Sequence, residues 1–358
     1  MVDDRTLFTN FWSKEAKTTR NVLARIPEGS SYRPDPKSRT AQEIAWQIVC
    51  EEQMIIDALE TGKVEWARPP MPATMKEVLE AYEKQSAGMP DRWSDLLACL
   101  ELSPVESEGL RLEGRNQDLT YHRLFGGQVL AQLVRASAAA VPGKAVKSLH
   151  ALFPRAGRSD EPVRYEVQTH HDGGTFATLG VVARQSHGAI AAATVSLHAA
   201  EDGPCFSDAF DPAHLPGPEH AIELDLLPWE TRSVSSLDTP DVGPASYELW
   251  MRTPAVSPDL APALLAYATD LTLIGTALRP VPGVSQRDAG TAFTSAVTSH
   301  TVWFHQPART DDWLLLRQHS PILAQGRCFG RGDVLTAGGA LVASYAQEAL
   351  LRLSPIEV

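Results

Sequence analysis

The sequence is poor in several features that mark common protein classes. Its four cysteines lie far apart and form no C-x-x-C pair, which argues against a disulfide framework and a cysteine zinc site. No run of about 18 apolar residues occurs, so no segment is expected to span a membrane. The first residues are acidic and lack the apolar stretch of a signal peptide. The G-x-S-x-G motif of α/β-hydrolases is also absent. Together these absences predict a cytoplasmic protein with reduced thiols.

Basic residues are also in the minority. The chain has 32 Lys and Arg against 44 Asp and Glu, which gives a net charge of −12. A nucleic-acid-binding protein normally has a basic balance or a basic patch, so this class is excluded. Apolar residues make up 43% of the 358 residues and charged residues 21%. These values predict folded cores and two or three domains.

Residues 1–92 are predicted to be helical. Thr40 with Glu43 and Thr74 with Glu77 form capping boxes, in which each side chain can bond an unpaired backbone N–H at a helix start. The apolar residues recur at helical spacing and predict three amphipathic helices. Residues 26–64 resemble the first half of DinB-like four-helix bundles, whose metal is held by histidines. Gln47 stands where the first histidine would be, so we expect a half-bundle without metal.

The next part of the chain has the pattern of helices and antiparallel strands. Residues 93–200 contain a helix that begins at Gly126-Gly127 and four strand-like segments with Gly-rich turns. Residues 201–243 are rich in Pro, Asp and Ser and predict a linker. Residues 244–358 repeat the order of a long helix followed by strands. We predict an α+β fold with two hotdog units, in each of which a helix packs on an antiparallel sheet.

An internal repeat supports this interpretation. Ser148 to Phe153 precede Ser299 to Phe304 by 151 positions, and Arg158 and Asp160 precede Arg309 and Asp311 by the same number. One offset across a whole set of strands indicates duplication and a pair of units related by a two-fold axis. Pairing two sheets edge to edge would also cover an exposed edge of each.

The stretch from Pro258 to Pro280 predicts one buried apolar helix with a single carboxylate, Asp270, in its middle. A buried carboxylate without partners is costly, so it is paired, hydrogen-bonded or raised in pKa. Asp270 is therefore a candidate catalytic residue. The alternative is an Asp at a solvated edge of the helix that makes only local hydrogen bonds.

Several segments in the same order resemble the acyl-CoA thioesterase II family. They are Asp118-Leu119, LFGGQVL at 124–130, Asp172-Gly173 with Thr175-Phe176, LAYATDL at 265–271, HTVWFHQP at 300–307, Trp313-Leu-Leu, Arg331-Gly332, and LVASYAQE at 341–348. The resemblance covers about residues 93–352. It implies a double hotdog that hydrolyses fatty acyl-CoA in fatty acid metabolism, with an Asp, a hydroxyl residue and a Gln that hold the attacking water.

By position, the resemblance assigns the Asp to Asp270 and the Gln to Gln347. The family's hydroxyl residue falls at Val297 in this chain. Ser299 would share a face with Val297 by strand alternation and is one replacement. Thr298 is the other, and it requires a one-residue slip or a β-bulge.

CoA binding is expected to need free backbone N–H groups and a local basic rim. Gly126 and Gly127 at a helix start are candidates for the former. Arg123, Arg155 and Arg331 are candidates for the latter, because Arg matches phosphate geometry. Arg158 and Arg327 are further candidates, and each of these arginines has the alternative of an ordinary surface charge. CoA enters as part of the substrate, and no cofactor or metal is expected.

Two alternative functions remain open at this point. Val297, together with Leu179-Gly180 where the family has arginines, also fits an acyl-CoA-binding protein with weakened turnover. Asp208 to His214 resembles the Asp/His motif of hotdog enoyl-CoA hydratases, and this reading predicts that His214 reaches the acyl tunnel. In every case we expect acyl-CoA as the ligand and a homo-oligomer, either a dimer or a tetramer.

Overall fold

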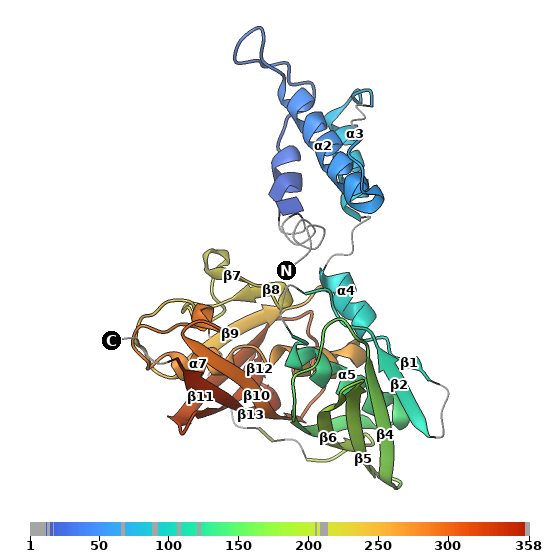
Figure 1. Ribbon diagram of the computed structural model, residues 1–358, viewed down its shortest axis with the longest axis vertical. Coiled ribbons are helices and arrows are strands. Elements are labelled where there is room, and N and C mark those ends of the chain that lie inside the picture. The colour runs from blue at the N-terminus through green and yellow to red at the C-terminus, as the bar shows by residue number, and fades with distance from the viewer. Residues whose placement is uncertain are drawn as a thin grey trace. The chain divides into compact units, whose positions relative to one another are not determined.

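The computed structural model describes residues 12, 15–16, 18–65, 69–87, 92–105, 109–119, 123–204, 206–207 and 214–354. The chain divides into two compact units, Met1–Asp95 and Leu96–Val358 (Figure 1). Of the features singled out in the sequence, Cys205 and residues 208–213 lie outside the described part.

The N-terminal unit is helical, as predicted. Its two long helices are α2 (Ala41–Thr61) and α3 (Met75–Ala87). Both capping boxes are confirmed, because Glu43 N donates to Thr40 Oγ1 at 3.2 Å and Glu77 N donates to Thr74 Oγ1 at 3.1 Å. A small core joins the helices and consists of Leu23, Ala45, Trp46, Val49, Cys50, Met75, Val78 and Tyr82. The likeness to DinB-like bundles stays a prediction.

The C-terminal unit is built on one continuous antiparallel sheet of 13 strands. The strands of the first half are β1 (Ser103–Pro104), β2 (Leu110–Gly114), β3 (Ala145–Leu152), β4 (Val163–Asp172), β5 (Phe176–Gln185) and β6 (Gly188–His198). Those of the second half are β7 (Ala221–Leu224), β8 (Leu227–Arg232), β9 (Ser246–Arg252), β10 (Phe293–Phe304), β11 (Leu314–Ala324), β12 (Arg327–Thr336) and β13 (Leu341–Leu353).

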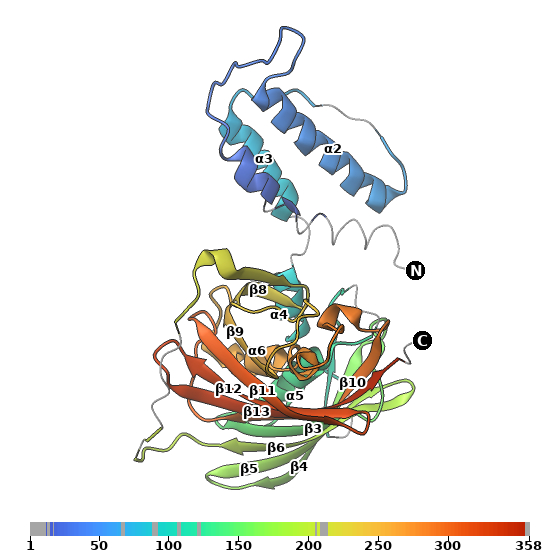
Figure 2. The same cartoon turned by 90° about the vertical axis from the view of Figure 1, so that its left-hand side faces the viewer.

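The helices of this unit pack on one face of the sheet. They are the end of α4 (Arg92–Cys99), α5 (Gly126–Ala140), α6 (Ala261–Ala268) and α7 (Leu273–Leu278). Figure 2 shows the sheet curving around α5 and α6, which pack against each other. We call the face toward these helices the inner face and the opposite one the outer face. This arrangement confirms the predicted double hotdog.

The order of strands shows the duplication directly. It runs β1-β2-β4-β5-β6-β3 in the first half and β10-β13-β12-β11-β9-β8-β7 in the second. Leaving aside the outermost strands, each half is the other half in reverse, and the two meet where β3 pairs with β10. β3 and β10, which would be edge strands if the halves were separate, thus pair with each other and leave no exposed edge between the halves.

The register between β3 and β10 locates the two-fold relation. Ser148 lies opposite Trp303, and Leu152 lies opposite Ser299. Adding 151 to the β3 residues of these pairs, Ser148 and Leu152, gives Ser299 and Trp303, so the offset exchanges the two pairs. His150 lies opposite Thr301, its own counterpart in the repeat, with 2.6 Å between Nδ1 and Oγ1. A local two-fold axis therefore passes through this pair.

The predicted offset of 151 is not gap-free. It relates β3 to β10, but Ser196 opposite Ser148 corresponds to Glu348 opposite Ser299, an offset of 152. The extra residue lies between β12 and β13, because Val181 opposite Ala193 corresponds to Gly332 opposite Tyr345, offsets of 151 and 152. The repeat also preserves a bulge in each half, at Lys147 in β3 and at Thr298 in β10, which are 151 residues apart. A bulge adds one residue to a strand and changes where its side chains point.

The predicted linker at 201–243 is not wholly irregular. It contains the short 3₁₀-helix η1 (Pro218–His220), β7 and β8, and β8 pairs with β9 at the end of the sheet. The Pro and Ser content of this segment predicted a linker. The strands were missed because they are short and lie at an edge of the sheet, where proline is tolerated.

The predicted single helix from Pro258 to Pro280 is broken. A 3₁₀ turn, η2 (Pro258–Leu260), leads into α6, and the helix stops at Thr269 before restarting as α7 at Leu273. Thr269 Oγ1 bonds the Ala266 carbonyl oxygen at 3.0 Å, an alternative to the regular helical bonds. By length and composition Pro258–Leu278 also passes the test for a membrane span, but most of it is buried in the fold, as in a core helix.

Candidate active site

The break between α6 and α7 delivers Asp270 to a cavity of about 490 Å³. The carboxylate is only 5% exposed, so the solvated alternative for Asp270 is wrong. The cavity lies between the start of α5, the loop after β3, α7 and the bulged part of β10. Its wall includes Arg123, Leu124, Phe125, Gly126, Val129, Phe153, Arg155, Leu226, Leu271, Ile274, Phe293, Ala296, Val297, Thr298 and Leu350.

Two opposing effects set the charge of Asp270. Burial raises the pKa of its carboxyl from 3.8 to about 7, because the interior solvates the ion poorly. The backbone N–H of Gly127, at the start of α5, donates to the carboxylate and lowers the pKa. Burial is the larger effect. A carboxyl that titrates near pH 7 can both accept and return a proton under ordinary conditions.

The two glycines let α5 approach this close. A Cβ on Gly126 would lie 2.7 Å from Asp270 Oδ2, and one on Gly127 would lie 2.5 Å from the Tyr267 carbonyl oxygen. Both distances are far shorter than real Cβ contacts. The predicted role of this pair in CoA binding stays a prediction. In the structure the two glycines leave room for the end of α6, and the Gly127 N–H bonds Asp270.

Gln347 and His300 lie side by side on the inner face. They are directly opposite each other on β13 and β10. His300 Nδ1 is 2.8 Å from Gln347 Oε1, and His300 Nε2 is 3.0 Å from Thr269 Oγ1. Gln347 is 2% exposed. Among the described residues, neither Gln347 Nε2 nor Asp270 Oδ1 has a hydrogen-bond partner, although both atoms are buried.

His300 also connects these residues to Asp270. Its Nδ1 lies 3.9 Å from Asp270 Oδ1. Burial lowers the pKa of His300 from 6.5 to about 4, although the hydrogen bond with Gln347 acts in the opposite direction. The imidazole is therefore neutral at pH 7 and forms no ion pair with Asp270. Structure thus brings together Asp270, Gln347 and a histidine that was not singled out from the sequence.

The bulge in β10 decides between the two candidate hydroxyl residues. Thr298 is the extra residue and lines the cavity with Val297. Its Oγ1 donates to the Glu348 carbonyl oxygen at 3.0 Å. Ser299 pairs with Leu152, which is half exposed, and shares the outer face with Thr301. The predicted placement of Ser299 at the site is therefore wrong, and of the two candidates only Thr298 lines the cavity.

The candidate arginines separate into two groups. Arg123 and Arg155 line the cavity, and Arg155 donates to the His187 carbonyl oxygen. Arg331 lies opposite Ala346, which alternates with inner-face Gln347, so it lies on the outer face. Its predicted role at the site is wrong. Arg158 and Arg327 are exposed and paired with Asp160 and Glu348.

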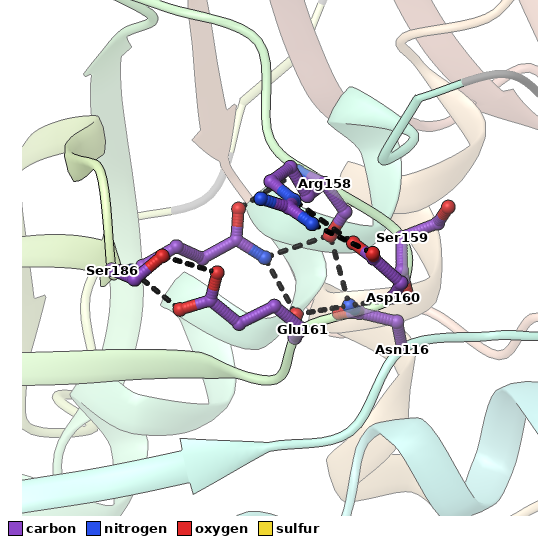
Figure 3. A network of polar contacts seen from close by, with 7 residues as sticks. Asn116, Arg158, Ser159, Asp160, Glu161 and Ser186 are labelled. Atoms are coloured by element: carbon purple, nitrogen blue, oxygen red, sulfur yellow. Dashed lines mark hydrogen bonds and ion pairs between the residues drawn. The ribbon is translucent and has the colours of Figure 1, made fainter.

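A polar network anchors the loop that carries Arg155 (Figure 3). The buried amide of Gln185 accepts from Arg158 N at 2.8 Å and donates to the carbonyl oxygens of Arg158 and Glu161 at 2.7 and 2.6 Å. Asn116 donates to the Glu161 carbonyl oxygen at 2.6 Å, and the Glu161 carboxylate accepts from Ser186 Oγ at 2.8 Å. The loop is thus held by side chains from the connection after β2, from the end of β5 and from the turn after β5.

Comparisons with known proteins match this architecture. Residues 116–198 match the model of the acyl-CoA thioesterase N-terminal domain, and residues 192–351 match that of the C-terminal domain. An acyl-CoA thioesterase II from Mycobacterium marinum has a solved structure that is 31% identical over 74% of this chain and 98% of its own, with a TM-score of 0.60. The chain belongs to the acyl-CoA thioesterase II family.

Two more relatives agree. The tesB protein of Mycobacterium avium subsp. paratuberculosis is 29% identical over 74% of this chain and all of its own, with a TM-score of 0.62. Acyl-CoA thioesterase 2 of Haemophilus influenzae is 29% identical over an aligned length of 294 residues, and the match covers 74% of this chain and the full length of that protein. The family resemblance inferred from the motifs is confirmed, and the N-terminal unit lies outside the family models.

Two further outcomes concern histidines. His214, which the hydratase alternative places in the acyl tunnel, is exposed and does not line the cavity. His300 was missed, although it begins the HTVWFHQP segment used for the resemblance. The repeat held a usable signal, because its counterpart in the first half is Leu149, a fully apolar residue. A polar residue that replaces an apolar one at a repeated core position suggests a specific role.

Proposed function

We propose that this thioesterase-family protein hydrolyses acyl-CoA thioesters to a free acid and CoA. The relatives named above are acyl-CoA thioesterases. Asp270 lines the cavity, and Gln347, which is not among the lining residues, is connected to Asp270 through His300. One observation carries the proposal: a carboxylate oxygen of Asp270 and an amide nitrogen of Gln347 are buried and lack partners among the described residues. Such groups are costly to leave unpaired, and a water molecule with a thioester carbonyl supplies the missing donor and acceptor.

In the proposed first step, the water is held by Asp270 Oδ1 and attacks the carbonyl carbon of the thioester. Asp270 takes the proton that the water loses as the new C–O bond forms. Gln347 Nε2 donates to the carbonyl oxygen, on which negative charge develops. A fixed donor in a buried site stabilises such charge strongly, because it does not have to reorient during the reaction.

In the proposed second step, the tetrahedral intermediate collapses. The C–S bond breaks, and the CoA sulfur leaves with the proton that Asp270 had taken. The carboxyl pKa near 7 suits both roles, because neither transfer is strongly uphill. The backbone N–H of Gly127 holds the other carboxylate oxygen and orients the base. Atoms and charge balance over the two steps, and no cofactor takes part.

The rest of the cavity accounts for the two ends of the substrate. Leu271, Ile274, Phe293 and Leu350 form an apolar wall for an acyl chain. Arg123 and Arg155 provide positive charge in a protein that is acidic overall, and they suit the phosphates of CoA.

The test is the release of free thiol from a panel of acyl-CoAs of different chain lengths. The wild-type protein should release CoA, and Asp270→Asn should reduce the rate by at least about a hundredfold because the base is lost. Equal rates for the two proteins would remove Asp270 from the mechanism.

The binding-only alternative has a distinct outcome. Tight acyl-CoA binding by the wild-type protein without thiol release would support it. This alternative was based on Val297 at the position of the family's hydroxyl residue. The bulge places the hydroxyl residue Thr298 at the cavity, which supports hydrolysis over binding alone. The predicted homo-oligomer and the cytoplasmic location stay predictions, and light scattering of the purified protein would test the first.

A further inference from the structure

His300 lies at the centre of a short chain of polar contacts. Its ring is fully buried, with Thr269 Oγ1 3.0 Å from Nε2 and Gln347 Oε1 2.8 Å from Nδ1. Thr269 immediately precedes Asp270, so the end of α6 holds both the imidazole and the base. The ring of Tyr345 lies parallel to the imidazole, with 6.3 Å between ring centroids. These contacts leave the imidazole little freedom to turn.

The chemistry of these groups restricts the proton positions. An amide oxygen only accepts hydrogen bonds, so the contact with Gln347 Oε1 requires a proton on Nδ1. A neutral imidazole then has a lone pair on Nε2, which needs a donor. The Thr269 hydroxyl is such a donor. It lies 3.0 Å from both His300 Nε2 and the Ala266 carbonyl oxygen, so its one proton can serve either acceptor.

We propose that His300 is a positioning residue, which holds Gln347 Oε1 through Nδ1–H and thereby directs Gln347 Nε2 toward the thioester oxygen. This inference rests on the proposed hydrolysis and adds a residue to it. Without His300, the Gln347 amide could rotate and present its oxygen, which would repel the developing negative charge. The lowered pKa of His300 agrees with this arrangement. At pH 7 the imidazole is neutral, so it carries one ring proton and does not form an ion pair with Asp270.

The repeat shows that the fold itself does not need a histidine here. Leu149 occupies the corresponding place in β3 and is buried equally well. His300→Leu therefore introduces a residue that the same strand position already accepts in the first half. Its opposite neighbour there is Val195, where the second half has Gln347. The polar pair replaces an apolar pair only in the half that contributes Asp270.

Three substitutions separate the two ring nitrogens. Asn can place an amide N–H near the position of Nδ1, whereas Gln can reach only the position of Nε2, and Leu offers no donor. We expect His300→Leu and His300→Gln to lower kcat by about a hundredfold with KM changed less than about twofold, as for loss of one oriented donor. His300→Asn should keep kcat within about tenfold of the wild type by restoring the bond to Gln347.

A double substitution tests whether His300 acts through Gln347. In the Gln347→Ala background, His300→Leu should cost less than about a further twofold in kcat, since coupled residues are not additive. A merely structural histidine would cost the same in both backgrounds, and that result would overturn the inference. So would a His300→Leu enzyme with wild-type kcat.

The proposed function can fail separately. If the wild-type protein releases no CoA, hydrolysis is refuted, and nitrogen NMR of ¹⁵N-histidine-labelled protein still tests the arrangement. A neutral His300 with its proton on Nδ1, assigned by comparison with His300→Leu, supports the inference. A proton on Nε2 overturns it. If hydrolysis depends on Asp270 but not on His300, the function stands and the positioning role falls.

Discussion

Replacing Asp270 with Asn should stabilise the protein while it removes the proposed base. The carboxyl pKa is about 7 in the folded chain and 3.8 without burial, a difference of about 3 pH units. Each unit corresponds to about 1.4 kcal/mol, so the ionised carboxylate costs the folded state up to about 4 kcal/mol. Asn has a similar shape, can accept from Gly127 N–H, and carries no charge to desolvate.

The sign of this effect depends on pH. Below pH 3.8 the carboxyl is protonated in both states and its contribution to stability is fully present. Between pH 3.8 and about 7 the unfolded chain loses the proton first, so the free energy of unfolding falls as pH rises. Above pH 7 the carboxyl is ionised in both states, and the free energy of unfolding no longer changes with its titration. The advantage of Asp270→Asn over the wild type should therefore be small at pH 4 and largest at pH 8.

Thermal unfolding of the two proteins at pH 4 and pH 8 measures this advantage. A gain of 4 kcal/mol corresponds to an increase in Tm on the order of 10 °C for a domain of this size. His300 titrates in both proteins, so its contribution cancels in the difference. Asp160→Asn is a matched control, because Asp160 is exposed and its pKa is lowered by Arg158; it should show no gain. An Asp270→Asn protein that is less stable at pH 8 would refute the reasoning.

The pH profile of hydrolysis should show the same carboxyl: kcat/KM should fall about tenfold per pH unit below pH 7, because the base must be ionised, and a flat profile from pH 5 to 8 would contradict this. Gly127→Ala should lower Tm and abolish thiol release, because its Cβ would lie 2.5 Å from the Tyr267 carbonyl oxygen, whereas Gly174→Ala meets no atom within 4 Å and should behave as wild type. Arg123→Ala and Arg155→Ala should each raise KM for acyl-CoA by about tenfold with little change in kcat. Arg331→Ala, on the outer face, is the control and should leave KM unchanged. Equal KM values in all three variants would remove the basic rim from the proposal.

Much of the fold was predictable because its signals are local or repeated. Each capping box lies within four consecutive residues, so its hydrogen bonds do not depend on the rest of the fold. The offset between Ser148 and Ser299 is a property of the sequence alone, and it predicted two units related by a two-fold axis. The short edge strands β7 and β8 were missed, since their pairing partners are set by the sheet and their composition resembles that of a loop.

By itself the sequence determined the duplicated hotdog, the family, and the pairing of Asp270 with Gln347 as the proposed site. Only the tertiary structure decided how that site is completed. The break after Thr269 turns Asp270 into the cavity, and the bulge in β10 brings Thr298 to the cavity and leaves Ser299 outside. His300 gains its position from strand pairing with Gln347 across 47 residues. Such features depend on contacts between distant segments, which residue types and spacing do not specify.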